Sequence, residues 1–359
     1  MWTSNELTRR LGIALPIVQA PLGGGPGTPE LTAAACEAGA FGILGAGYLD
    51  PDDARDAVRR TRSLTGRPFG VNLFLAGPPR RTEAAAARDR LERVATELGL
   101  EAALPAEPRG LPDPLQQLEV LLEEEVRVVS FTFGCPAPDV VAALHDVGRL
   151  CVGTAGTVEE ARLLAAAGVD AVVAQGSEAG GHRGGFTDVA ETPGLVALVP
   201  AVVDAVKVPV IASGGIMDGR GVVAALALGA QAAALGTAFL RSPEAGTNPA
   251  YRKALLLADE TSTVTTSAFS GRPARGIRNA YIEAFPPGDP EVPDFPVMNY
   301  LTRPLRTASA AAGSAEAQSL WAGQGVGRDR DLPAADLIAA LVAEAEEALT
   351  RLGSGGVPG

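Results

Sequence analysis

Eight short apolar runs, each followed by a segment with helical periodicity, constrain this chain more than any other feature of its sequence. The runs are rich in Val, Ile, Leu, Phe and Ala and are almost continuously apolar. Strands that are buried on both faces have this composition, and parallel strands covered by helices are the usual case. The eight runs span residues 16–21, 41–46, 69–74, 126–134, 149–155, 170–176, 208–215 and 232–240.

The segments between the runs carry the start and stop signals of helices. In the segment 157–168, for example, Thr157 and Glu160 have the spacing of a capping box, and Gly168 follows as a terminator. Eight units of strand and helix predict an α/β fold, a (β/α)₈ TIM barrel. The rival architecture is a doubly wound open sheet.

The alternation of strand and helix stops after residue 241. Residues 242–310 mix helical segments with loops, and an amphipathic helix is predicted over 333–352. We therefore expect two parts: a barrel over 1–241, and a second, mostly helical C-terminal lobe with the final helix over 242–359. The lobe is expected to lie over the mouth of the barrel.

Composition and motifs exclude several classes of function. A net charge of −12 disfavours nucleic-acid binding, which needs a basic face. No apolar stretch is long enough to span a bilayer without Gly, Pro or charge, and the N-terminus lacks the apolar core of a signal peptide. Three dispersed cysteines (Cys36, Cys135 and Cys151) favour a reduced, cytoplasmic protein without disulfides. No metal-binding motif, P-loop or Rossmann fingerprint is present.

Small residues gather where the seventh and eighth runs end. The segment ASGGI ends with Gly215 and Ile216, and the segment ALGT comprises Ala234, Leu235, Gly236 and Thr237. In a (β/α)₈ barrel the loops after strands seven and eight commonly hold a phosphate. Glycine also lets backbone N–H groups approach an anion closely. We expect a phosphate-bearing cofactor or substrate here; the alternative is that these glycines only make tight turns.

Polar side chains end two further runs. Asn72, in GVNLF, has an amide that can both donate and accept at the edge of a heterocycle. The alternative is a turn residue that ends the strand. Gln175 ends the sixth run and can hydrogen-bond a ligand in the same way.

His182 is one of only two histidines and stands among five glycines in AQGSEAGGHRGG, residues 174–185. An imidazole titrates near neutral pH and suits proton abstraction, whereas the alternative is a solvated loop histidine. The glycines, Gly180 among them, would let the loop lie against a flat ring. The other histidine, His145, falls within a helical pattern and is given no role.

Seven segments, taken in order, resemble the nitronate monooxygenase family, formerly called 2-nitropropane dioxygenases. The segments are QAPLGGG, GVNLF, SFTFGCP, AQGSEAGGHRG, SGGIMDGRG, LGTAFL and LWAGQGVG, of which EAGGHRG is the most specific. The resemblance covers nearly the whole chain. It implies an FMN-dependent oxidoreductase with a barrel and a mostly helical lobe that helps to form the substrate pocket.

The resemblance also assigns residues. It implies that His182 is the catalytic base and that FMN is contacted by Asn72, Gln175 and Gly180. It implies that the phosphate end of FMN is held by Gly215, Ala234, Leu235, Gly236 and Thr237. The family often has Gln where this chain has Ala234, so a contact at that position would have to come from the backbone.

The implied reaction is the oxidation of an alkyl nitronate by O₂ to a carbonyl compound and nitrite. Propionate 3-nitronate is the substrate that the family suggests, with neutral nitroalkanes as further candidates that need His182 to remove a proton. Ser270 and Tyr300 could line the pocket from the second lobe; the alternative for both is ordinary packing. The rival enzymes are a flavin-dependent enoyl-acyl-carrier-protein reductase and an NADH:quinone reductase, which would use NAD(P)H. A non-catalytic binder of a flavin or of another phosphate-bearing ligand is the alternative of another class.

Overall fold

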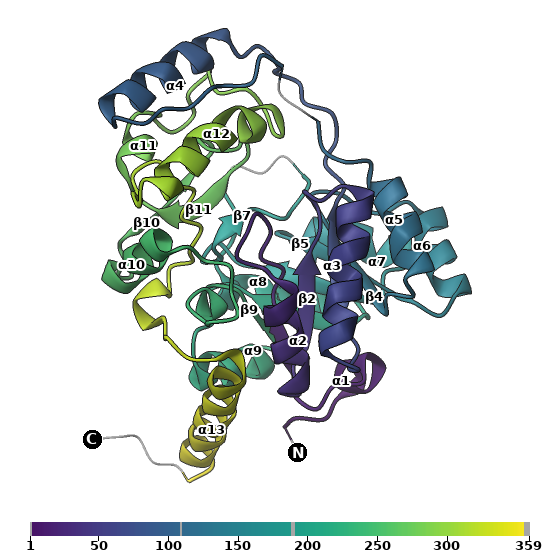
Figure 1. Cartoon of the computed structure of the whole chain (residues 1–359). Helices are drawn as coiled ribbons and strands as arrows, with labels where there is room; N and C mark the ends of the chain where they lie inside the picture. The colour runs from purple at the N-terminus through teal and green to yellow at the C-terminus, as the bar shows by residue number, and fades with distance from the viewer. Residues whose placement is uncertain (1, 108–109, 188–190, 355–359) are drawn as a thin grey trace.

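The centre of the molecule is a closed barrel of eight parallel strands (Figure 1). The computed structural model describes residues 2–107, 110–187 and 191–354. The barrel strands are β1 (Ile17–Gln19), β2 (Phe41–Gly45), β3 (Gly70–Phe74), β4 (Val128–Thr132), β5 (Leu150–Ala155), β6 (Ala171–Gln175), β8 (Val210–Ser213) and β9 (Ala232–Leu235). Because β9 pairs with β1, with Ala234 opposite Val18, the sheet is closed. The predicted (β/α)₈ barrel is confirmed, and the open sheet is wrong.

Helices surround the barrel and bury the outward faces of its strands. They are α2 (Pro29–Glu37), α3 (Pro51–Leu64), α5 (Pro114–Glu123), α6 (Pro138–Asp146), α7 (Val158–Ala167), α8 (Leu195–Ala205) and α9 (Gly219–Ala227). Thr28, Asp113, Thr157 and Asp218 each accept a backbone N–H of the first helical turn. These N-caps fix where each helix begins after its strand.

The two ends of the barrel differ in chemistry. At the N-terminal end, α1 (Glu6–Leu11) places Leu7 and Leu11 against the inward-facing Val18 and Phe41, so that end is filled with apolar side chains. At the C-terminal end the inward-facing residues are polar, and Asn72 lies opposite Ser130 in the register of β3 and β4. Polar groups at this end leave it suited to a ligand.

A second lobe stands over that C-terminal end, and α4, α11 and α12 form its upper part in Figure 1. Its helices are α4 (Ala85–Glu97), α10 (Pro249–Leu257), α11 (Ala280–Glu283) and α12 (Val297–Ala311). The lobe has a hydrophobic core of its own, which includes Leu91, Phe269, Tyr281, Leu301 and Leu305. Its antiparallel sheet, in the order β10 (Thr263–Thr266), β11 (Ala274–Ile277), β7 (Gly181–His182), was not predicted, because these strands are short and carry Thr, Arg and Gly.

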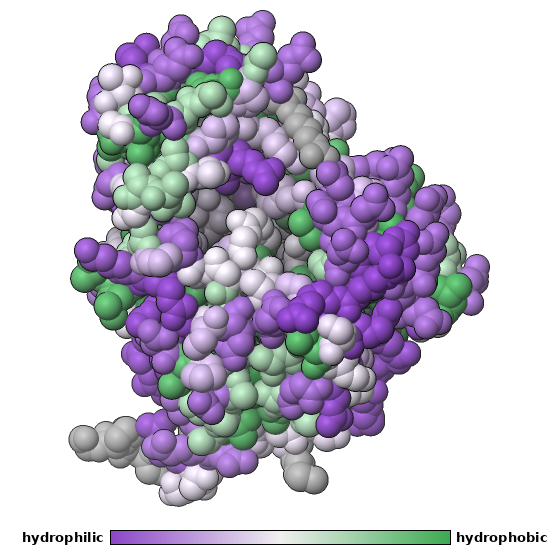
Figure 2. All heavy atoms as spheres, in the orientation of Figure 1, coloured by the Kyte–Doolittle hydropathy of each residue, from purple (hydrophilic) through white to green (hydrophobic). Residues whose placement is uncertain are grey.

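Two helices connect the parts of the chain on either side of residue 241. Helix α4, from before that position, packs with α12 in the second lobe, while α13 (Ala334–Gly353) packs against α9 and α2 of the barrel. The domain boundary at 241 stays a prediction. The molecular surface is hollowed between the lobe and the barrel (Figure 2), at the level where Figure 1 places β7. Across the described residues no helix is long and apolar enough to cross a membrane.

Candidate active site

The loop after β6 folds back onto the strand that it leaves. The Gln175 side chain accepts a hydrogen bond from the Gly184 N–H at 2.8 Å and donates one to the His182 carbonyl at 3.2 Å. The guanidinium of Arg183 donates to the carbonyl oxygens of Gly176, Ser177 and Ala179 at 2.8–3.3 Å. The loop is therefore closed by side chains at both of its ends, and His182 is held at a defined place rather than on a solvated tip.

The two glycines before His182 are needed for different reasons. A Cβ on Gly180 would lie 2.5 Å from the Gly323 nitrogen, so the backbone of a distant segment passes where a side chain would be. Gly181 has φ +72°, in the left-handed region that side chains disfavour, and has open space around it. Gly180 therefore lies against the chain at Ala322 and Gly323, and its predicted contact with a flat ring stays a prediction.

His182 is enclosed by aromatic rings from several elements. The imidazole centroid lies 5.6 Å from Phe133, 5.7 Å from Phe295 and 5.4 Å from Trp321. Its Nε2 is 2.9 Å from the hydroxyl of Ser270, a residue of the β10–β11 connection that is itself buried. The structure therefore brings the predicted base together with the predicted lobe residue Ser270.

Burial lowers the pKa of His182 most, and together with the positive charges of Arg272, Arg306 and Arg183, in that order, it brings the pKa to about 3. The expectation that this imidazole titrates near neutral pH is wrong for the protein alone. The cause lies in tertiary packing, since Arg272 and Arg306 come from the second lobe. The imidazole is neutral at physiological pH and keeps a lone pair for accepting a proton.

Arg272 and Arg306 are half-buried cations that form no ion pair among the described residues. Arg272 lies 4.2 Å above the ring of Phe133 and donates to the carbonyls of Arg183 and Gly185. Arg306 donates to Asn299, while its Nε is buried without a hydrogen-bond partner in the described chain. Burial lowers the pKa of both guanidinium groups, Arg272 to about 10. Half-buried cations without an ion pair create a positive potential that favours an anion.

Asn72 lies in β3 with its side chain directed into the polar end of the barrel. Its Nδ2 donates to the Ser130 carbonyl, the Ser130 hydroxyl and the Thr132 hydroxyl at 3.0–3.2 Å. Its Oδ1 accepts no hydrogen bond from the described residues. Since the donor side is held, the acceptor is presented in one orientation, which fits the N–H edge of a heterocycle.

The ends of β8 and β9 lie side by side, with Ser213 opposite Ala234. Beyond these strand ends, the backbone N–H groups of Gly215, Gly236 and Thr237 donate to no group in the described chain. Gly215 has φ +68°. Free N–H groups on adjacent loops fit a phosphate. Leu235 and Ala234 differ from them, because both side chains lie in hydrophobic clusters and both backbones belong to β9.

A segment from the C-terminal third, residues 321–325, connects these parts, and we call it the strap. The Gly323 N–H donates to the Thr237 hydroxyl at 2.9 Å, and the Gln324 N–H donates to the Glu178 carbonyl at 2.9 Å. A Cβ on Gly325 would lie 3.0 Å from the Gly215 carbonyl. The strap begins with Trp321 beside His182. It thus contacts both the loop after β6, which carries His182, and the loops after β8 and β9, where a phosphate is expected.

Several site residues carry no signal in the sequence. The aromatic wall also includes Phe74, 4.6 Å from Phe133, and Tyr48, 5.0 Å from Phe74. Glu160 was expected to complete a capping box, but its carboxylate instead accepts the N–H groups of Gly156, Phe186 and Thr187 and so holds the loop beyond His182.

Tyr300, a candidate pocket residue from the sequence, is buried in α12. His145 lies in α6, away from this site, and its Nε2 is hydrogen-bonded to the Asp170 carboxylate at 2.9 Å.

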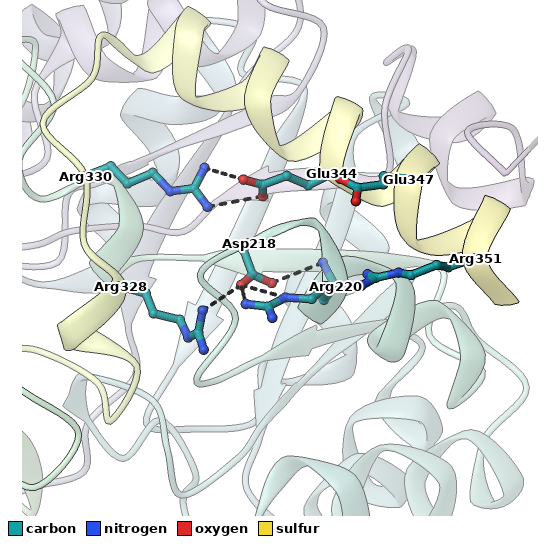
Figure 3. Close-up of a pocket in the computed structure, with 7 residues that line it drawn as sticks. All are labelled: Asp218, Arg220, Arg328, Arg330, Glu344, Glu347 and Arg351. Atoms are coloured by element: carbon teal, nitrogen blue, oxygen red, sulfur yellow. Dashed lines mark hydrogen bonds and ion pairs between the residues drawn. The ribbon is translucent and has the colours of Figure 1, made fainter. Parts of the chain in front are cut away.

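A second hollow, between the start of α9 and helix α13, has no connection with this chemistry. Figure 3 shows three of its arginines, Arg220, Arg328 and Arg330, directed toward carboxylates of the same hollow. Asp218 bonds Arg220 and Arg328, and Glu344 bonds Arg330. The Gly219 N–H also donates to the Glu344 carboxylate at 2.9 Å, which ties the C-terminal helix to the start of α9. The described residues contain no cluster of three or more His, Cys, Asp or Glu that could hold a metal ion.

Comparison with known proteins gives a consistent result along the whole chain. A family model described as nitronate monooxygenase matches residues 4–344. A probable nitronate monooxygenase of Staphylococcus saprophyticus is 40% identical over 359 residues, covering 98% of this chain and 100% of the relative. A nitroalkane oxidase from Streptomyces ansochromogenes superposes with a TM-score of 0.89 at 44% identity, covering 97% of this chain and all of that one. FabK from Thermotoga maritima superposes with a TM-score of 0.78 at 30% identity, covering 99% and 100%.

Proposed function

Because this chain belongs to the nitronate monooxygenase family, we propose that it oxidises alkyl nitronates with O₂ to a carbonyl compound and nitrite, with FMN as its flavin. The comparisons make it a flavin-dependent oxidoreductase. Bound FMN would supply the redox chemistry, taking electrons from the substrate and passing them to O₂. The protein would supply binding, orientation and electrostatics.

The observation that carries the proposal is a neutral imidazole in a positively charged, aromatic-walled site. The charges acting on His182 are all cationic, from Arg272, Arg306 and Arg183. An anionic nitronate is stabilised in such a potential, whereas a second cation is not. A nitronate also needs no proton removed before oxidation, so a base of low pKa is no obstacle to it.

The polar end of the barrel has hydrogen-bonding groups without a partner among the described residues, and these groups suit FMN. Asn72 offers Oδ1 to the ring, and Gln175 keeps one amide N–H beyond its bond to the loop. The unpaired N–H groups of Gly215, Gly236 and Thr237 suit the phosphate. Gly180 and Ala234 would contribute by small size, and Leu235 by the position of its backbone at the end of β9. Their side chains offer no polar contact to FMN.

Oxidation of a neutral nitroalkane depends on His182 more than oxidation of a preformed nitronate, because His182 has to remove the α-proton first. General-base help of this kind contributes about 10²–10⁴-fold to a rate. The nitronate formed beside the imidazole would raise the pKa of His182 and so assist the transfer. His182→Asn should therefore abolish activity on neutral nitroalkanes and reduce activity on preformed nitronates less. Equal losses on both, with flavin retained, would refute the base role.

Propionate 3-nitronate is the proposed substrate because it carries a carboxylate as well as the nitronate. The unpaired guanidinium groups of Arg272 and Arg306 can bind that second negative charge. A carboxylate and a guanidinium form a strong, charge-assisted pair when water is excluded.

The experiment that tests the proposal is a visible spectrum of the purified protein under anaerobic conditions. Propionate 3-nitronate and NADH are added in separate cuvettes, and the flavin is released and identified by mass. Bleaching by the nitronate, recovery in air and nitrite formation are expected, with FMN as the released flavin. Bleaching by NADH alone would identify an NAD(P)H-dependent reductase instead. An unchanged spectrum with either compound would favour a non-catalytic flavin binder.

A further inference from the structure

The ring of His182 has one nitrogen tied to the protein and one free. Nε2 lies 2.9 Å from the Ser270 hydroxyl. Nδ1 makes no hydrogen bond with any residue that the structure describes. The ring is held by more than this bond, since β7 pairs with β11 through His182 and Ala274 and aromatic rings enclose the imidazole. Which nitrogen carries the proton therefore depends on what Ser270 can do.

The Ser270 hydroxyl has three polar neighbours and only one proton. Its oxygen lies 3.1 Å from the Arg272 carbonyl and 3.3 Å from the Arg272 N–H, besides Nε2 of His182. A carbonyl can only accept and an N–H can only donate, so the hydroxyl proton satisfies the Arg272 carbonyl and one lone pair satisfies the Arg272 N–H. The remaining lone pair then requires a donor on His182. If the hydroxyl donated to His182 instead, the Arg272 carbonyl would lose its hydrogen bond from Ser270.

We propose that Ser270 is a positioning residue that holds His182 in the tautomer with the proton on Nε2, so that Nδ1 is the atom that takes the substrate's proton. This inference rests on the proposed role of His182 as a base. The bond that the other nitrogen makes generally sets the tautomer of a histidine. Ser270 is buried, so water does not compete freely for its oxygen.

The proton transfer that follows is balanced within the site. The α-C–H bond of a neutral nitroalkane breaks, its proton goes to Nδ1, and its electron pair stays on the substrate as the nitronate. The Nε2–H stays hydrogen-bonded to Ser270 throughout. A preformed nitronate skips this step, so Ser270 matters for neutral nitroalkanes and much less for nitronates.

The presence of only two histidines in the chain allows a direct test. The flavin-loaded protein is labelled with ¹⁵N-histidine, and His145→Gln removes the second set of ring signals and so assigns His182. At neutral pH we expect Nε2 of His182 to have the shift and one-bond proton coupling of a protonated nitrogen, and Nδ1 to have the shift of an unprotonated one. The opposite pattern, or equal population of both tautomers, would overturn the proposal whatever the enzyme's activity.

A kinetic test separates this inference from the proposed function. Ser270→Ala should lower kcat/KM on a neutral nitroalkane about tenfold, the loss of one well-placed hydrogen bond, and change kcat/KM on its nitronate less than about twofold. Ser267→Ala removes a hydroxyl from the same connection that is not bonded to His182 and should change neither. If Ser270→Ala acts equally on both substrates, or on neither, while His182→Asn still abolishes nitroalkane turnover, the positioning role fails and the base role stands.

Discussion

Mild acid should destabilise this protein through His182 in particular. The pKa of His182 is about 3 in the folded protein, against about 6.5 for an unperturbed histidine. Between these values the unfolded chain binds a proton that the folded protein rejects, so stability falls as the pH falls through this window. The largest cause is burial, followed by the guanidinium groups of Arg272 before β11, Arg306 on α12 and Arg183 just after β7.

The size of the loss in stability depends on how far the pH lies below the pKa of His182 in the unfolded chain. At pH 7 the unfolded histidine is mostly neutral and the contribution is small. At pH 5 the pH is about 1.5 units below the pKa of the unfolded histidine, which corresponds to a loss of about 2 kcal/mol of unfolding free energy. The loss is complete only near pH 3, where the folded protein also takes up the proton.

The assay is urea unfolding of the flavin-loaded protein at pH 7 and pH 5, compared with the His182→Gln variant. Other groups that titrate in this range contribute equally to both proteins, so the difference between the two losses isolates His182. We expect the wild type to lose about 2 kcal/mol more than the variant. Arg272→Met should raise the pKa of His182 and shrink this difference. Equal losses in wild type and His182→Gln would refute the argument that His182 is buried as a neutral base.

Four substitutions, one of them a control, test other parts of the site. Gly180→Ala places a Cβ against Gly323, so it should lower the unfolding free energy by about 1–3 kcal/mol and also lower flavin retention. Gly181→Ala is the control, because its Cβ meets no atom. It should lower the unfolding free energy by about 1–2 kcal/mol through its left-handed backbone and leave flavin retention unchanged. Glu160→Gln should lower the unfolding free energy by about 1.5–3 kcal/mol, measured in urea, because charged hydrogen bonds to the loop weaken. Arg306→Met should raise KM for propionate 3-nitronate about tenfold and act less on a nitronate without a carboxylate; equal effects on both would contradict the assigned contact.

The sequence predicts the barrel well because burial on both faces leaves a strong local signal. Each of the eight apolar runs contains a barrel strand, and Thr28, Thr157 and Asp218 cap the helices expected of them. The small sheet of β10, β11 and β7 leaves no such signal. Its strands are two to four residues long, and their pairing depends on the loop after β6 reaching the second lobe.

The site shows the same division between local and tertiary information. His182, Asn72 and the glycines at Gly180 and Gly215 stand out in the sequence because strand ends and glycine-rich loops are local patterns. Glu160 does not, because its spacing from Thr157 is equally consistent with a capping box, and only the position of residues 185–187 diverts its carboxylate.

The pKa of His182 marks the limit of what local sequence can give. Nothing in AQGSEAGGHRGG distinguishes an imidazole that titrates near neutrality from one that is held neutral to about pH 3. The difference comes first from burial and then from Arg272 and Arg306, which reach the ring only because the second lobe folds over the barrel. The motif therefore specifies where the imidazole stands, and the second lobe contributes to its lowered pKa. A lobe with carboxylates in place of those arginines would raise the pKa of the same histidine and favour a neutral nitroalkane over an anionic nitronate.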